Sequence, residues 1–167
     1  MQSSDLVPHA LRSPKLMGEA YLKLYLDETL PVLLLMRQVL EVLVLPTARL
    51  TPMPNVPPPV LGLINRRSRV LWLVDLPQVL GLGALDGGRP WHAVAIIQVG
   101  TLPLALAVHR VEGMGWWQPH EIHPPPPHLP PHLIGFLHGC VLLQHQMLPV
   151  LNPESIVNAP VFLNHDR

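Results

Sequence analysis

Charged side chains are scarce in this chain. Only 13% of its 167 residues are charged, against about 25% in a typical soluble domain, and 11 basic and 11 acidic residues leave no net charge at pH 7. Nucleic acids and anionic membrane surfaces are bound by strongly basic faces. We therefore expect neither of them as a partner. The low charge instead predicts apolar surface that a protein partner covers.

Cysteines and long hydrophobic runs are also lacking. The single cysteine, Cys140, cannot form an internal disulfide, which fits a reduced, cytoplasmic setting. The N-terminus lacks the basic start and apolar run of a signal peptide. The most hydrophobic window, residues 30–45, is broken by Arg37 and Glu41, whereas a membrane-spanning helix needs about 20 apolar residues. We expect a cytoplasmic protein that does not insert into a membrane.

The patterns that carry catalysis are missing too. The glycine-rich stretch 81–88 lacks the GxGxxG spacing, and no carboxylates are spaced as an acid–base pair. We expect no catalytic residue, no cofactor and no enzyme activity. Four histidines between residues 120 and 132 suggest a metal site, but the prolines at 124–127 hold that segment extended. We expect no metal ligand there; a metal- or small-molecule-binding barrel that uses loop 116–132 is the alternative.

Proline, by contrast, is abundant, and it favours short strands joined by fixed turns. A helix interior excludes proline, and this chain has 22 prolines. Apolar runs and alternating patterns predict strands over residues 21–26, 32–36, 39–45, 61–65, 70–74, 93–99, 104–108, 133–137 and 141–143. Short helical segments are expected at 77–80 and 146–151. This spacing of strands and turns predicts an all-β barrel or sandwich.

A faint internal repeat suggests two related halves. At an offset of 72 residues, the pair Leu30-Pro31 aligns with Leu102-Pro103, Val39 with Val111, and Val42 with Met114. One further residue of shift aligns Gly62 with Gly135. A repeat of this length fits a small β-barrel. We therefore expect a first barrel over about 18–82 and a second over about 91–151 in one domain, 18–151, with chain ends that cross over. Residues 1–17 are expected to be a flexible extension and 152–167 a tail.

Two groups of residues are candidates for partner binding. Arg67 lies in the turn between two predicted strands, where a guanidinium can reach a partner's carboxylate or simply keep the turn soluble. Val39, Val42, Val111 and Met114 occupy matching places in the two halves. These four are either core residues or, if exposed, the lining of an apolar groove for a partner's helix.

The segment 52–76 carries a resemblance to a known family. It reads PMPNVPPPVLGLINRRSRVLWLVDL and is preceded by VLEV at 39–42. Over about residues 18–151 the chain resembles the CheW family, the adaptors of bacterial chemotaxis. Its family pattern is V-x-E-I, then P-x-P-N-A-P-x-x-V-x-G-V-I-N-L-R-G-x-V-x-P-V-I-D-L.

The resemblance implies both a fold and a function. The implied fold is two five-stranded, SH3-like barrels packed together, with short helical turns. The implied function is a non-catalytic scaffold in chemotaxis or pilus motility, which couples the cytoplasmic tip of a methyl-accepting chemoreceptor to the regulatory domain of a CheA-type histidine kinase. The partner-binding residues that it implies are Arg67, Asn65, Gly62, Val39, Glu41, Val42, Val111 and Met114.

The chain departs from the family pattern at the turn itself. Arg66 stands where the pattern has leucine, and Ser68 where it has glycine. If that glycine has a positive φ, Ser68 strains the turn by roughly 1 kcal/mol. In the second half, His109 and Gln144 stand at positions that are usually acidic. The alternative function is a degenerate scaffold that binds a single partner or its own kind.

Overall fold

The computed structural model describes residues 18–163, which fold into ten strands and several short helices. The strands are β1 (Glu19–Tyr25), β2 (Pro31–Leu35), β3 (Val39–Pro46), β4 (Val60–Arg66), β5 (Arg69–Asp75), β6 (Trp91–Val99), β7 (Leu102–Val108), β8 (Arg110–Trp117), β9 (Leu137–Leu143) and β10 (Gln146–Leu151). The helices are η3 (Met36–Gln38), η4 (Thr47–Arg49), α2 (Leu76–Val79), η5 (Pro119–Glu121), α3 (Pro131–Ile134), α4 (Pro153–Val157) and α5 (Pro160–Leu163). The expected extension 1–17 and the end of the expected tail, 164–167, lie outside the described residues.

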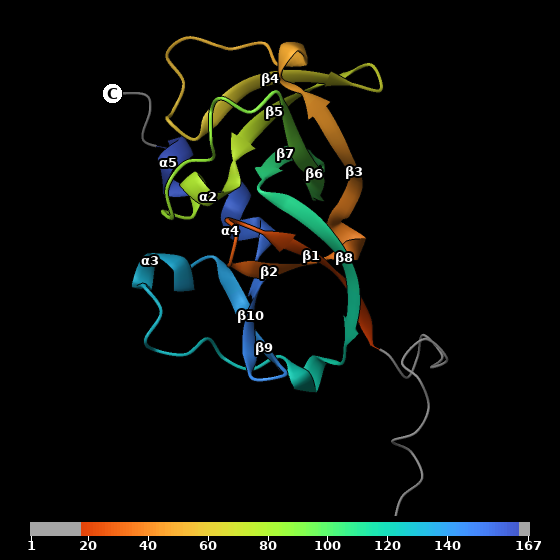
Figure 1. Ribbon diagram of the computed structural model, residues 1–167, viewed down its shortest axis with the longest axis vertical. Coiled ribbons are helices and arrows are strands. Elements are labelled where there is room, and N and C mark those ends of the chain that lie inside the picture. The colour runs from red at the N-terminus through yellow and green to blue at the C-terminus, as the bar shows by residue number, and fades with distance from the viewer. Residues whose placement is uncertain (1–17, 164–167) are drawn as a thin grey trace, which may run out of the picture.

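The strands form two five-stranded sheets, stacked one above the other in Figure 1. The upper sheet has the order β3-β6-β7-β5-β4, and the lower sheet has the order β8-β1-β2-β10-β9. Read strand by strand, the two orders are the same, because β3 corresponds to β8, β6 to β1 and β7 to β2. The predicted all-β fold with two five-stranded subdomains is therefore confirmed.

The division of the chain between the sheets differs from the expected one. The upper sheet takes residues 39–108, whereas the lower sheet takes β1 and β2 from the start of the chain and β8 to β10 from its end. A boundary between 82 and 91 therefore does not separate them. The reason is long-range pairing: β7 lies parallel to β5, and β2 lies parallel to β10. The first hairpin of each half of the chain therefore lies in the sheet that the other half completes. This exchange involves more of the chain than the expected crossing of the chain ends.

The internal repeat is present in the structure, with one correction. At the offset of 72 residues, β1, β2 and β3 align with β6, β7 and β8. Beyond them the offset rises to 77, because the connection that contains α3 is longer than its counterpart. The structural counterpart of Gly62 is therefore Gly139, not Gly135. Each is the third residue of its strand, and a Cβ on either would meet a backbone oxygen, that of Thr51 at 2.3 Å or that of His123 at 2.4 Å.

Three apolar clusters hold the fold together. One fills the upper barrel, around Ile64, Leu73 and Ile96, and a second fills the lower barrel, around Leu33 and Leu148. The third and largest lies between the two sheets. It takes Leu22, Leu24 and Leu26 from β1 and its following turn, Ala93, Ala95 and Ile97 from β6, and Ile156 from α4. Alternate side chains of one strand therefore enter different cores, as a period of two requires.

Two local predictions from the sequence are wrong, and one strand was missed. Residues 133–137 are not a strand, because Leu133 lies in the helical turn α3 that follows Pro130 and Pro131. Residues 146–151 form β10 instead of a helix, since they pair with β9 along their length. The strand β8 was not predicted, because two glycines, Gly113 and Gly115, interrupt its apolar pattern.

A buried carboxylate ends the strand β5. Asp75 is 2% exposed, and its side chain accepts hydrogen bonds from the backbone N–H groups of Gln78 and Leu85, at 3.0 and 2.8 Å. Burial raises the pKa of Asp75, and the two N–H donors oppose that shift. The carboxylate caps α2 and anchors the loop that leads to β6. The aspartate of the sequence LVDL is therefore structural.

Candidate partner-binding surface

The turn between β4 and β5 is tight and left-handed. Arg67 and Ser68 have φ values of 51° and 63°, and Arg66 pairs with Arg69 at the base of the hairpin. Two successive residues with positive φ define a type I′ turn, which suits the twist of a hairpin. The turn of the other half is built alike, with Gln144 and His145 at 48° and 65°. The expected positive φ at Ser68 is thus present.

Replacing Ser68 with glycine should stabilise the protein. Serine has a Cβ that disfavours the left-handed region, so we expect Ser68→Gly to raise the free energy of unfolding by about 0.5–1 kcal/mol. Urea denaturation followed by circular dichroism measures this change. His145→Gly, at the same place in the second turn, should give a similar gain. A loss of stability for both variants would contradict the expectation.

An ion-pair cluster joins this turn to β3. Glu41 Oε1 accepts hydrogen bonds from Arg66 Nε, at 3.0 Å, and from Arg66 Nη2, and its Oε2 lies 3.4 Å from Arg67 Nε. These hydrogen bonds, first of all those from Arg66, lower the pKa of Glu41. Because β3 and β4 are the two edges of the upper sheet, the cluster shows that the sheet curls until its edges meet.

The two arginines of the cluster differ in exposure. The side chain of Arg66 is 38% exposed and that of Arg67 is 76% exposed. Arg66 therefore makes the main contact with Glu41, whereas Arg67 reaches into solvent. Asn65, the neighbouring residue on β4, is exposed as well.

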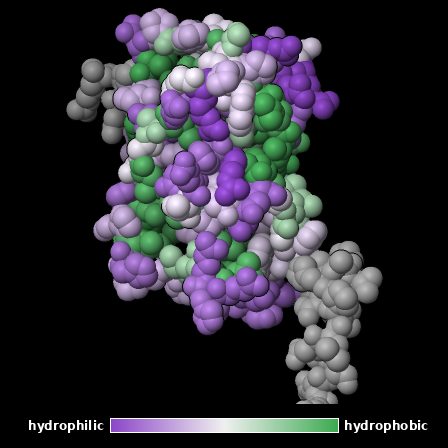
Figure 2. Space-filling view, viewed as in Figure 1, coloured by the Kyte–Doolittle hydropathy of each residue, from purple (hydrophilic) through white to green (hydrophobic). Residues whose placement is uncertain are grey.

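A row of apolar side chains faces solvent along the edge strand β3. Leu40, Val42 and Val44 are 54%, 42% and 65% exposed, whereas the alternate residues Leu43 and Leu45 pack in the interior of the upper barrel. Figure 2 shows hydrophobic side chains gathered on the side of the molecule where β3 lies. Monomeric proteins rarely leave such a row uncovered without a function. Leu40 and Val44 belong to this surface but were not predicted, although alternation around Val42 indicates them.

The edge strand β8 of the lower sheet continues this side of the molecule (Figure 1). Met114 on β8 is 51% exposed. Val39 and Val111 are half-buried and pack against the cluster between the sheets. The two members of each matched pair therefore behave alike. Val42 and Met114 are available at the surface, and Val39 and Val111 are part of the base beneath them.

Gly62 holds a different kind of position. It is buried, with a φ of 146°, and its backbone lies directly against Thr51. Thr51 and Leu63 exchange two backbone hydrogen bonds of 2.8 Å, which cover this part of the β4 edge. Gly62 therefore shapes the strand that carries Asn65 and Arg67, without presenting a side chain of its own.

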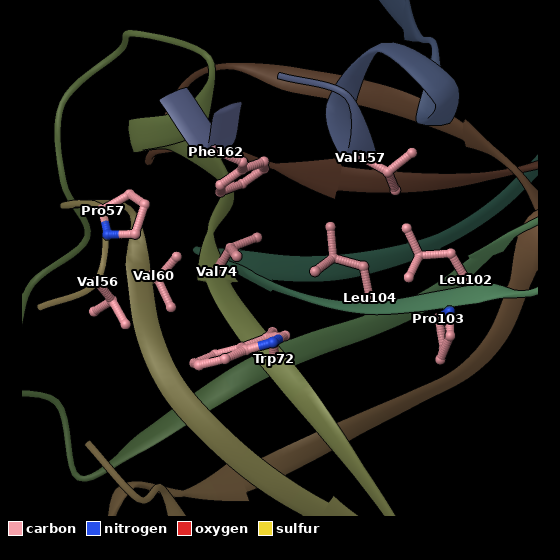
Figure 3. A pocket seen from close by; sticks show the side chains of 10 residues that line it. All are labelled: Val56, Pro57, Val60, Trp72, Val74, Leu102, Pro103, Leu104, Val157 and Phe162. Atoms are coloured by element: carbon pink, nitrogen blue, oxygen red, sulfur yellow. The ribbon is translucent and has the colours of Figure 1, made fainter. Parts of the chain in front are cut away.

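None of the eight predicted residues lines the apolar cavity of about 280 Å³ that opens in the upper half of the molecule. Figure 3 shows Phe162 and Val157, from the C-terminal helices, facing strand residues that include Trp72 and Leu104. In the lower sheet, the connection between β8 and β9 is longer and contains α3, whose Leu133 is buried in the core between the sheets. The shorter connection between β3 and β4 has no such helix beside the cavity.

The histidine-rich loop and Cys140 both lie within the described residues 18–163. No three His, Cys, Asp or Glu side chains in this range are grouped so that they could hold a metal ion. Burial raises the pKa of the Cys140 thiol, which donates to the carbonyl oxygen of Pro124 at 3.5 Å. None of the helices in the same range is long and apolar enough to span a membrane.

Comparison with known proteins decides the family. The model of the CheW-like domain matches residues 21–161. The chain belongs to the CheW-like family. It is 29% identical over 106 residues to the chemotaxis protein CheW of Rhizobium meliloti (strain 1021), an alignment that covers 64% of this chain and 68% of that protein.

A solved CheW structure has the same fold. The scaffolding protein TtCheW from Thermoanaerobacter tengcongensis superimposes with a TM-score of 0.74 at 21% identity, over 87% of this chain and 96% of that one. This agreement confirms the predicted architecture of two SH3-like subdomains. The CheW-like match also begins and ends near β1 and α5, so both exchanged hairpins lie inside the family domain.

Proposed function

We propose that this protein is a non-catalytic adaptor that couples the helical cytoplasmic tip of a methyl-accepting chemoreceptor to the regulatory domain of a CheA-type histidine kinase, in chemotaxis or pilus motility. The observation that carries this proposal is membership of the CheW-like family, together with the exposed apolar row of β3. An adaptor needs surfaces that bind its partners, and it needs no catalytic groups. We place its action in the cytoplasm, where receptor tips and kinases meet.

The surface formed by β3 and β8 supports docking of a helix. Val42 and Met114 offer apolar contact from the two edge strands, and Val39 and Val111 form a half-buried base beneath them. An amphipathic helix lays its apolar residues against such a surface, with neighbouring polar contacts that set its position. Arg67, at the adjacent turn, supplies a charge that is exposed and held by a single long ion pair.

Substitution of Val42 should separate binding from folding. Val42 is 42% exposed, so Val42→Asp should change the free energy of unfolding by no more than about 1 kcal/mol. The added charge should weaken binding of a chemoreceptor-tip fragment at least tenfold, about 1.4 kcal/mol, because it would be covered by an apolar helix face. Isothermal titration calorimetry with the tip fragment, and separately with the kinase regulatory domain, measures the two affinities.

Leu142→Asp is the matched control. Leu142 is 68% exposed on β9, which lies at the edge of the lower sheet away from β8, and it is not part of the proposed surface. We expect it to leave both affinities within about twofold of the unsubstituted protein. Arg67→Glu should weaken binding of the receptor-tip fragment and leave binding of the kinase regulatory domain unchanged. The adaptor proposal fails if neither partner binds the unsubstituted protein, and self-association in that case would favour a degenerate scaffold.

A further inference from the structure

The apolar cavity of the upper half has an uncharged interior that is open to solvent. Ten side chains line it, all of them valine, leucine, proline, tryptophan or phenylalanine. The only polar side-chain atom among the ten is the indole nitrogen of Trp72. Figure 3 shows Phe162 on one side of the cavity and Trp72 on the other. Trp72 and Leu102 are 43% and 54% exposed, so the cavity can be entered from solvent. Such an interior accepts a neutral apolar group and disfavours an ion.

The internal repeat shows what this cavity lacks. One isolated bridge joins Thr51 to Leu63 in the upper half, and its counterpart joins His123 to Cys140 in the lower half. The segment between the bridged residues is 52–62 in the upper half and 124–139 in the lower half. The lower segment is therefore longer by five residues, the same five that raise the offset of the repeat from 72 to 77.

The two segments match at both ends, so the five extra residues can be located. The upper segment reads PMPNVPPPVLG and the lower one reads PPPPHLPPHLIGFLHG. The prolines at 58–59 match those at 130–131 with the offset of 72, and Val60 matches Leu137, the first residue of β9, with the offset of 77. The insertion is therefore HLIGF, residues 132–136, which includes most of α3.

In the lower half, these five residues fill space beside the end of α2. Leu133 is 4% exposed, and both Leu133 and Phe136 pack in the cluster between the sheets. His132 lies against the chain that follows α2, since a Cβ on Gly81 would be 2.8 Å from the His132 ring. The insertion thus closes the gap between α2 and the core with apolar side chains.

In the upper half, the matching place is the cavity. The counterpart of α2 is α4, because α2 follows β5 and α4 follows β10. Val157, the last residue of α4, lines the cavity. Val60, Val74 and Leu104 also line it, and they contribute to the same cluster between the sheets. The cavity is therefore the counterpart of the space that Leu133 and Phe136 fill in the lower half.

From this comparison we propose that the cavity binds a small, neutral apolar molecule, no larger than a leucine and a phenylalanine side chain together. The inference does not depend on the adaptor function proposed above. An apolar cavity of about 150 Å³ is enough to hold a benzene molecule. With a volume of about 280 Å³, this cavity has room for an aromatic ring that carries a short alkyl chain. The ring would lie between Trp72 and Phe162, where aromatic side chains offer stacked or edge-on contacts.

Isothermal titration calorimetry of the full chain with ethylbenzene tests this proposal. We expect saturable binding of one molecule, with a dissociation constant of about 0.1–1 mM, the range open to so small a ligand. Benzoate, which has a carboxylate in place of the ethyl group, should not bind. Ethylbenzene should also change the tryptophan fluorescence of the protein. Trp72→Phe should abolish that change, because Trp91, Trp116 and Trp117 do not line the cavity.

Two variants fill the cavity with groups of the protein itself. One inserts the residues HLIGF between Pro59 and Val60, as in the lower half, and the other, Val157→Phe, adds a ring without changing the length of the chain. Each should weaken ethylbenzene binding by about tenfold or more, because the volume is no longer free. Leu142→Phe adds the same ring at a 68% exposed position outside the cavity, and it should change the affinity by less than about twofold.

Four results would overturn the proposal. The first is the absence of saturable ethylbenzene binding, and the second is full affinity in both filled variants. The third is an equal loss of affinity for Val157→Phe and Leu142→Phe. The fourth is binding that weakens as the protein concentration rises, together with self-association in analytical ultracentrifugation, which would assign the cavity to a second copy of the chain instead.

Discussion

Neither half of the chain is expected to fold when residues 18–82 and 91–163 are produced separately. The first piece contains β1 and β2 of the lower sheet without β8, β9 and β10, and it contains β3 without its partner β6. Two- and three-stranded remnants with exposed apolar faces are marginal in water. We expect each piece to show no cooperative unfolding transition by circular dichroism. An equimolar mixture of the two pieces should recover a cooperative unfolding transition, because together they supply every strand.

A contiguous fragment provides the matched comparison. Residues 38–109 contain β3 to β7, which is the complete upper sheet with its own internal cluster. This fragment exposes the face that normally packs between the sheets, so it should be less stable than the whole chain. It should nevertheless retain more strand structure, and more protection from hydrogen exchange, than 18–82. Independent cooperative folding of 18–82 would contradict the exchange of hairpins.

Gly62→Ala is expected to be the most damaging single substitution among the partner-surface residues. Its φ of 146° costs an alanine about 1–3 kcal/mol, and the new Cβ would lie 2.3 Å from the carbonyl oxygen of Thr51. Relief of that clash requires the two hydrogen bonds between Thr51 and Leu63 to break, each contributing about 1 kcal/mol. We therefore expect the free energy of unfolding to fall by roughly 3–5 kcal/mol in urea denaturation.

Gly113→Ala separates the two causes. Gly113 has a φ of 150°, close to that of Gly62, but a Cβ there would meet no atom within 4 Å. Its replacement should therefore cost only the conformational part, about 1–3 kcal/mol. Equal losses for the two variants would show that contact with Thr51 contributes nothing. A stable Gly62→Ala protein that no longer binds its partners would assign Gly62 to the interface instead.

Local sequence patterns were enough to place all five strands of the upper sheet and the turn between β4 and β5. A mainly apolar run marks β3, and the polar run between two apolar segments marks the hairpin of β4 and β5. These features depend on neighbours within a few residues, which is why they can be seen in the chain. The positive φ at Ser68 was expected only from the glycine that the family pattern has there. The same segment also carries the resemblance to the CheW family, and hence the expected pair of five-stranded subdomains.

Only the tertiary structure decided which strands pair across the molecule and which residues face a partner. The parallel contacts of β2 with β10 and of β5 with β7 join segments far apart in sequence, and no local pattern encodes them. Alternation along β3 separates Glu41 from Val42 but cannot tell which face looks outward. That choice, and the closer contact of Glu41 with Arg66 than with Arg67, depend on how the sheet curls until its two edges meet.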